Sequence, residues 1–315
     1  MKSVVFAYHN MGVTGLEALL RNGFEVGAIF SHADDPGEKC WFTSVADWAK
    51  SRNISVLCPE DINKPHWIGH IAALAPDAVF SFYYRKMLCQ EILNIPTVGA
   101  YNLHGSLLPA YRGRVPVNWV LVNGEKQTGV TLHNMVAKPD AGDMVGQKAV
   151  DIAFEDTAVI LYDKLCRASA ALLDEVLPLI RTGKAPCVVQ DAGKASYFGG
   201  RKPEDGRINW SWSATRIYNL IRAVTDPYPG AFSFLPDGTK MLLWWGVPEE
   251  RETEMKLFKG LEAGTVVVDN KAKRVYVACG AGRIRLQDIE INGNRIKNGA
   301  IWQYFRQYRN MPVLR

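Results

Sequence analysis

The stretch YNLHGSLLPAYRGR, residues 101–114, indicates a buried strand that ends in a loop carrying polar side chains. Within the largely apolar strand, Asn102 and His104 are two positions apart, so in an extended segment both side chains point to the same side. Ligands bind beyond the carboxyl ends of the strands in an open parallel sheet. We therefore expect this pair to face a ligand.

An amide beside an imidazole suits acyl transfer. Asn102 could donate a hydrogen bond to the oxyanion of a tetrahedral intermediate, and His104 could take a proton from an attacking amine. The turn KPDAGD, residues 138–143, supplies the carboxylate of Asp140, which beside the imidazole would orient it and raise its pKa. On spacing alone, a buried hydrogen-bonded histidine and an ordinary turn aspartate explain these residues equally well.

The wider sequence resembles the folate-dependent formyltransferases. Residues 102–125, NLHGSLLPAYRGRVPVNWVLVNGE, and residues 128–145, TGVTLHNMVAKPDAGDMV, contain the Asn-x-His pair, the SLLP-x-x-RG turn and the D-x-G-D turn of that family. The resemblance places the catalytic triad of the family on Asn102, His104 and Asp140. It implies that 10-formyltetrahydrofolate donates the formyl group and that no metal is needed.

The resemblance also implies a folate site. Its expected contacts are Lys86, Met87, Leu88, Arg114, Val136, Ala137, Lys138 and Pro139. The backbone N–H and C=O groups of such segments can form hydrogen bonds with the donors and acceptors of a pterin ring. Taken by itself, the segment SFYYRKML, residues 81–88, fits the start of a helix with aromatic residues packed on the core. We expect His133, on a strand at residues 127–133, to be a sheet-face residue.

Apolar runs alternate with helical patterns in the first part of the chain. The expected strands are residues 4–8, 26–30, 54–57, 78–82 and 98–103. This alternation predicts an α/β fold, a doubly wound, Rossmann-like parallel sheet with right-handed crossovers. Gly12 and Gly15 lack the GxGxxG spacing, so they predict a strand-to-helix turn and no NAD site.

The second part of the chain has a different pattern. A long helix is expected from Thr157 to near Gly183, and then Gly- and Pro-rich polar residues and short strand-like runs follow. These runs predict a small β-barrel, which in the resembling family is of the oligonucleotide-binding type. We expect a catalytic domain at residues 1–190, a linker at 191–203 and the barrel at 204–308.

Composition describes an ordinary globular protein. The chain has 315 residues, 48% of them hydrophobic and 22% charged, a size that suits two domains. Six scattered cysteines without a CxxC pair argue against a zinc site or a disulfide framework and fit a reducing cytoplasm. The sequence shows no signal peptide at its start and no apolar run of about eighteen residues, so we expect no membrane association.

The charge is uneven along the chain. Residues 1–200 carry 18 basic and 20 acidic residues, a net charge of −2, and residues 201–315 carry 19 and 12, a net charge of +7. A basic second half predicts an anionic partner, either RNA or a nucleotide diphosphate.

Within the family, three segments resemble formyltransferases that act on UDP-4-amino-4-deoxy-L-arabinose in lipid A modification and polymyxin resistance. They are VVFAYHNMG (residues 4–12), SFYYRKML (81–88) and IRAVTDPYPGAFSF (221–234). We expect Arg201 and Arg222 to face the diphosphate and Tyr228 and Phe232 to stack on the base. Each of these residues fits a packed turn or a solvated arginine almost as well.

Three alternatives stay open. A different amino-sugar nucleotide or the amine of charged methionyl-tRNA could accept the formyl group, although the basic residues form no continuous run and we do not expect nucleic acid. From a different class, the chain could be a non-catalytic nucleotide- or RNA-binding module. In the bifunctional relatives a decarboxylating dehydrogenase half follows, and these residues contain no such half.

Overall fold

The computed structural model describes residues 1–33, 41–249, 260–308 and 313–315. The chain divides into two compact units. Unit 1 comprises Met1–Pro116, Lys126–Ile152 and Leu161–Gly199, and unit 2 comprises Val117–Glu125, Ala153–Ile160 and Gly200–Arg315. Residues 191–199, predicted as part of the linker, thus belong to unit 1, and two short segments within residues 1–190, predicted as part of the catalytic domain, belong to unit 2.

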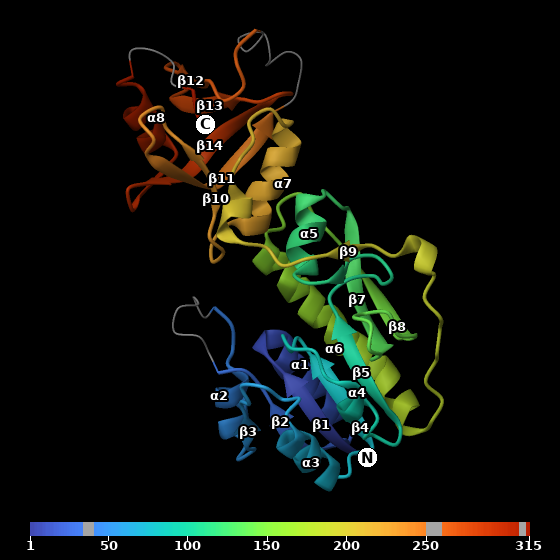
Figure 1. The fold of residues 1–315 in the computed structure, drawn as a ribbon. Coiled ribbons are helices and arrows are strands. Elements are labelled where there is room, and N and C mark those ends of the chain that lie inside the picture. Colours follow the sequence, from blue (N-terminus) through green and yellow to red (C-terminus); the bar gives the residue numbers. More distant parts are fainter. Residues whose placement is uncertain (34–40, 250–259, 309–312) are drawn as a thin grey trace. The chain divides into compact units, whose positions relative to one another are not determined.

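Unit 1 contains a seven-stranded sheet in the order β3-β2-β1-β4-β5-β7-β8 (Figure 1). Its strands are β1 (Lys2–Ala7), β2 (Glu25–Phe30), β3 (Val56–Leu57), β4 (Ala78–Phe82), β5 (Gly99–His104), β7 (Gln127–Asn134) and β8 (Met144–Asp151). The first five are parallel, as predicted, but β7 pairs antiparallel with β5 and with β8. The sheet is therefore mixed, with β7 and β8 at one edge running antiparallel to their neighbours.

Helices cover both faces of this sheet, as the prediction of a doubly wound fold requires. The helices of unit 1 are α1 (His9–Arg21), α2 (Val45–Lys50), α3 (Pro65–Ala73), α4 (Gln90–Leu93) and most of α6 (Ala158–Arg181). On one face, α3 and α4 pack through Ile71 and Ile92 against a core that includes Phe6 and Val79. On the other face α1 lies against β1 and β4, and α6 lies against β8.

Gly12 and Gly15 lie inside α1, which begins at His9, and so do not form the strand-to-helix turn that the sequence predicts. A Cβ atom at Gly15 would lie 2.2 Å from the ring of Phe82 on β4, so only glycine lets α1 approach the sheet this closely. The spacing of Gly12 and Gly15 is thus explained by helix packing.

Unit 2 is built on an antiparallel sheet in the order β10-β11-β14-β13-β12, with β15 paired to β14. Its strands are β10 (Ala231–Phe234), β11 (Lys240–Glu249), β12 (Val266–Asp269), β13 (Arg274–Ala278), β14 (Arg283–Ile291) and β15 (Asn294–Lys297). Its helices are α5 (Pro116–Val122), α7 (Ala214–Val224) and α8 (Gly299–Phe305). Short 3₁₀ turns lie at Pro203–Gly206 in this unit and at Ala192–Lys194 in unit 1.

The last described residues connect the two edges of this sheet. Arg315 exchanges backbone hydrogen bonds with Phe234 at the end of β10, while Leu314 donates to the carbonyl of Gly264, just before β12. Strands of a small barrel must close on one another in this way to leave no free edge. The second unit is therefore a mostly antiparallel β domain, in agreement with the predicted architecture.

Two further features concern the described residues as a whole. None of their helices combines the length and the apolar character needed to cross a membrane. Their five cysteines, Cys58, Cys89, Cys166, Cys187 and Cys279, are free thiols, and Cys40 lies outside the described residues.

Candidate active site

Strand β5 and its neighbour β7 position the first polar residues of the site. Asn102 and His104 lie at the carboxyl end of β5, and the antiparallel register sets His133 of β7 directly opposite Asn102. The loop between β7 and β8 carries Asp140, whose backbone has a φ of +52°. Strand β7 runs back toward the start of β5, where Asn134 lies opposite Tyr101, and the loop that follows brings Asp140 to Asn102 and His104.

The three predicted catalytic side chains converge. His104 Nδ1 lies 3.6 Å from Asp140 Oδ1, and Asn102 Nδ2 lies 3.4 Å from the same oxygen. The other carboxylate oxygen, Oδ2, accepts a hydrogen bond of 2.8 Å from the backbone N–H of Gly113. The amide and the imidazole come from the end of β5 and the carboxylate from the β7–β8 loop, and together they form one cluster.

The backbone fixes the tautomer of His104. Its Nε2 lies 2.8 Å from the carbonyl oxygen of Tyr111, and because a carbonyl only accepts hydrogen bonds, this contact assigns a proton to Nε2. In the neutral ring, Nδ1 then carries the lone pair, on the side of Asp140. His104 can therefore take up a proton at Nδ1, where the carboxylate stabilises the imidazolium that forms.

Burial and charge act in opposite directions on this pair. Burial lowers the pKa of His104 below its ordinary value, and Asp140 offsets only part of that effect. The expected effect of Asp140 is confirmed in direction, since the carboxylate raises the pKa of His104, but the desolvation of the ring is larger and the net pKa is lowered. For Asp140, burial alone would raise the pKa, but His104, His133 and the Gly113 N–H outweigh it and lower the pKa to about 2. At neutral pH the site thus holds a neutral imidazole beside an ionised carboxylate.

His133 belongs to this cluster, although we expected a sheet-face residue. The side chain is 2% exposed, and its Nδ1 lies 2.8 Å from the carbonyl oxygen of Asn134, which assigns the proton to Nδ1. Its Nε2 then accepts a 3.1 Å hydrogen bond from Asn102 Nδ2 and lies 3.5 Å from Asp140 Oδ1. The register between β5 and β7 places His133 opposite Asn102, and the periodicity of a sequence does not predict such a register.

This contact bears on the expected role of Asn102. Its amide nitrogen, the only donor of the side chain, faces His133 and Asp140. Donation to an oxyanion therefore requires the amide to turn or to exchange one of these partners. His133 and Asp140 hold the resting orientation of the group that we expect to stabilise the intermediate.

The expected folate contacts lie on three segments of unit 1. The loop that leads directly into Asp140 exposes four of them, Val136, Ala137, Lys138 and Pro139. Arg114, the residue directly after β6 (Arg112–Gly113), is also exposed. Lys86, Met87 and Leu88 follow β4, which neighbours β5 in the sheet. Met87 is exposed and Leu88 is buried, and the carbonyl of Met87 accepts a hydrogen bond from Asn63 Nδ2.

Unit 2 holds the residues expected to bind the nucleotide sugar, and two of them are buried. Arg222 is 3% exposed and donates to the carbonyl of Ala153 at 2.9 Å and to Asn219 Oδ1 at 3.0 Å. Phe232 is 8% exposed in β10. Their burial argues against the expected roles of Arg222 and Phe232, because a solute reaches neither side chain without displacing the core.

The other two residues are more accessible. Arg201 lies over the ring of Trp119 at 4.6 Å and donates to the carbonyl of Asp205 at 2.9 Å. Tyr228 is half-buried after the turn that follows α7.

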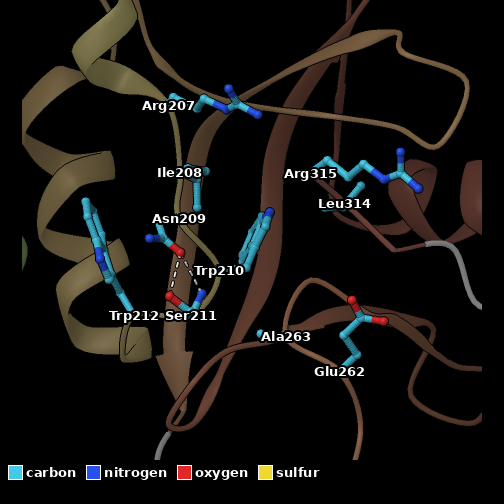
Figure 2. Close-up of a pocket in the computed structure, with 10 residues that line it drawn as sticks. All are labelled: Arg207, Ile208, Asn209, Trp210, Ser211, Trp212, Glu262, Ala263, Leu314 and Arg315. Atoms are coloured by element: carbon cyan, nitrogen blue, oxygen red, sulfur yellow. Dashed lines mark hydrogen bonds between the residues drawn. The ribbon is translucent and has the colours of Figure 1, made fainter.

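Unit 2 also contains a cavity of about 570 Å³ (Figure 2). Its lining residues are Arg207, Ile208, Asn209, Trp210, Ser211, Trp212, Glu262, Ala263, Leu314 and Arg315. Asn209 Oδ1 accepts hydrogen bonds from both the N–H and the hydroxyl of Ser211, and the indole N–H of Trp210 donates to Ser233. The cavity shares no residue with the cluster around His104 or with the four residues expected to bind the nucleotide sugar.

The fold and the cluster together are of the kind that acyl-transfer enzymes use: an amide, an imidazole and a carboxylate at the ends of strands in an α/β sheet. Residues 2–177 match the formyl transferase family, and residues 201–307 match the C-terminal domain of formyl transferases. The chain belongs to the formyltransferase family of enzymes.

Solved structures show the same fold. An N-formyltransferase from Helicobacter canadensis, in complex with folinic acid and dTDP-3-aminofucose, is 21% identical, with a TM-score of 0.67 over 91% of this chain and 99% of that one. WlaRD, a sugar 3N-formyl transferase in the presence of dTDP and 5-N-formyl-THF, is 20% identical, with a TM-score of 0.61 over 91% and 97% of the two chains. HypX from Aquifex aeolicus, in complex with tetrahydrofolic acid, is 16% identical, with a TM-score of 0.62 over 98% of this chain and 48% of that one.

Proposed function

We propose that this enzyme acts in the cytoplasm and transfers the formyl group of 10-formyltetrahydrofolate to the 4-amino group of UDP-4-amino-4-deoxy-L-arabinose. The observation that carries the proposal is the convergence of Asn102, His104 and Asp140 in a member of the formyltransferase family. The folate ligands of three solved structures and the dTDP-aminosugar of one support a folate donor and an amino-sugar acceptor.

The proposed reaction begins with attack of the sugar amine on the formyl carbon. A carbon–nitrogen bond forms, and negative charge develops on the formyl oxygen, where Asn102 donates a hydrogen bond. Neutral His104 accepts the proton of the amine at Nδ1, and the carboxylate of Asp140 stabilises the resulting imidazolium. The intermediate then collapses with cleavage of the bond to N10 of the folate. His104 returns its proton to that nitrogen, and tetrahydrofolate leaves.

The proposed folate site uses the exposed loop at residues 136–139, Arg114 and residues 86–88. Arg201 and Tyr228 remain the candidates for contact with the nucleotide. With this acceptor, the reaction would serve lipid A modification and polymyxin resistance, with a decarboxylating dehydrogenase as the fused or associated partner that supplies the amino sugar's precursor.

A second acceptor, charged methionyl-tRNA, is favoured by the net charge of +7 in residues 201–315. The structure weakens this argument, because several of these basic residues are paired within unit 2. Arg283 binds Glu249, and both Arg295 and Lys297 bind Asp288. These pairs interleave acidic with basic side chains, so the arginines and lysines named here do not form an uninterrupted basic surface for phosphates. We therefore favour the nucleotide sugar.

A formyl-transfer assay with 10-formyltetrahydrofolate tests both parts of the proposal. The acceptors are UDP-4-amino-4-deoxy-L-arabinose, a dTDP-linked amino sugar and charged methionyl-tRNA. We expect turnover with the UDP sugar, a shallow dependence on salt, and loss of turnover in His104→Ala. His66→Ala, a change of an exposed histidine on α3, serves as the matched control and should keep full activity.

Each part of the proposal can fail separately. Turnover with only the dTDP sugar would reject the proposed acceptor and keep the chemistry. Turnover with tRNA, with affinity that falls steeply as salt increases, would identify the second acceptor. Full activity of His104→Ala would reject the catalytic assignment.

A further inference from the structure

Residues 187–198, named here the strap, connect the two loops that contact the ring of His104. The strap follows α6 and ends with β9 (Tyr197–Phe198), in the yellow part of the chain in Figure 1. Near its start, Val188 exchanges two backbone hydrogen bonds with Met144, at 2.8 and 2.9 Å. At its end, β9 pairs in parallel with β6. All of these residues belong to unit 1.

The end of the strap holds the carbonyl group that contacts His104 Nε2. Tyr111 donates its backbone N–H to the hydroxyl of Ser196 at 2.9 Å, and its ring stacks on Phe198 with centroids 4.7 Å apart. Tyr111 has a φ of +61°, a conformation that is costly for a side chain of this size unless its surroundings hold it. The strap thus fixes the direction of the Tyr111 carbonyl.

The start of the strap holds the loop that presents Asp140 to His104 Nδ1. Gln190 is 7% exposed, and its Nε2 donates to the carbonyls of Asp140 at 3.0 Å and Gly142 at 2.6 Å. Asp140 also has a positive φ, a constrained backbone conformation. The carbonyl that Gln190 holds and the carboxylate that faces His104 both belong to this one residue. Two hydrogen bonds from a buried amide therefore fix where the carboxylate points.

A buried arginine sets the orientation of the Gln190 amide. Arg112 is 3% exposed and donates from Nε at 3.2 Å and from Nη2 at 2.7 Å to Gln190 Oε1. Because the guanidinium has only donors, the Gln190 oxygen must face Arg112 and the NH₂ group must face the two carbonyls. Gly113 follows, and its N–H completes the contact with Asp140 Oδ2.

We propose that Gln190 is a positioning residue for formyl transfer: with Arg112, it holds Asp140 at His104 Nδ1, while the same strap holds the Tyr111 carbonyl at Nε2. The inference rests on the catalytic role proposed for His104. Gln190 touches neither reacting atom, so its effect on the reaction passes through Asp140 and the imidazole.

Gln190→Glu tests this role in the full-length chain. It keeps the size of the side chain and gives Arg112 a carboxylate partner, but it replaces the donor to the two loop carbonyls with an acceptor. We expect kcat to fall about 10- to 100-fold, since displacing a catalytic group by about 1 Å has effects of this order. The KM values of folate and amino sugar and the melting temperature should stay close to those of the wild type.

Gln127→Glu is the matched control, because it makes the same change at an exposed glutamine at the opposite end of β7 from His133. It should leave kcat unchanged. A kcat of Gln190→Glu within twofold of the control, in a preparation in which His104→Ala is inactive, would overturn the inference and leave the proposed function intact. Activity of His104→Ala would overturn both.

Gln190→Leu supplies a readout that a purely structural role would not move. It removes the donors without adding a charge, so Asp140 is less firmly held and stabilises the imidazolium less. The acidic limb of the pH profile of kcat/KM should move to lower pH by about half a unit or more. An unchanged limb, in a folded variant, would show that Gln190 does not act through His104 and would overturn the inference.

Discussion

Replacing Asp140 with asparagine isolates the charge that acts on His104. Asparagine tolerates the positive φ of this position, and its oxygen can keep the hydrogen bond from Gly113, so the loop should retain its shape. The change removes a unit charge 3.6 Å from His104 Nδ1. At an effective dielectric constant of about 20, Coulomb's law gives about 4–5 kcal/mol for the attraction between that charge and an imidazolium before solvent relaxation.

The sign of the effect follows from the geometry. Asp140 raises the pKa of His104, whereas burial lowers it, so without the carboxylate only the lowering contribution remains. We expect the acidic limb of kcat/KM in Asp140→Asn to move to lower pH by about 1–3 units and kcat at neutral pH to fall about 100-fold or more. A pH–rate profile, with NMR titration of the His104 ring as an independent measurement, checks both. A limb that stays in place or moves to higher pH would refute the assigned contact.

The same variant makes a prediction for stability. Interactions in the folded state lower the pKa of Asp140 from 3.8 to about 2, which corresponds to a stabilisation on the order of 2 kcal/mol. Because the folded pKa is the lower one, this stabilisation is present above about pH 4 and is lost as the pH falls toward 2. Denaturant unfolding of the wild type should show this loss and Asp140→Asn should not. Parallel curves for the two proteins would contradict the depressed pKa.

The other predictions concern substitutions of single residues of unit 1. Asn102→Ala should lower kcat about 100- to 1000-fold and leave both substrates bound, and steady-state kinetics that show retained turnover would remove Asn102 from the oxyanion role. His133→Phe should lower kcat about tenfold, and a double-mutant cycle with Asn102→Ala should be non-additive because the two side chains share a hydrogen bond; additive effects would show that His133 acts elsewhere. Gly15→Ala should destabilise the protein by about 1–3 kcal/mol in urea unfolding, because its Cβ would overlap Phe82; an unchanged midpoint would mean that α1 shifts freely.

Much of unit 1 could be predicted because its signals are local. The strands that end near Asn102 are continuous apolar runs, as expected for parallel strands buried on both faces, and helical patterns separate them. The Asn-x-His pair lies within one strand, so the alternation of side chains alone puts both residues on one side. Asp140 is a candidate from its residue type and its turn, but on spacing alone an ordinary turn aspartate fits equally well, because a contact across 36 residues has no local signal; the resemblance decides in its favour.

The remainder of the site depends on contacts that no periodicity encodes. His133 joins the cluster because β7 runs antiparallel to β5 in one particular register, and a shift of one residue would turn its ring to the other face. The sequence predicts that Arg222 is accessible to a phosphate group. In the structure its side chain is buried and donates to backbone carbonyls within residues 153–156. Gln190 lies in a polar stretch that resembles a linker until the strap is seen to pack on the two loops.

The sequence by itself determined which chemical groups are available: an amide and an imidazole on one strand, a carboxylate on a tight turn, and a chain pattern that makes an α/β unit followed by a β unit. Tertiary structure alone decided their protonation and orientation. The depth of burial sets the balance between desolvation and the charge of Asp140, and the β7 register and the strap set which atoms face each ring nitrogen. Both depend on distances between residues far apart in the chain, and those distances exist only after the chain has folded.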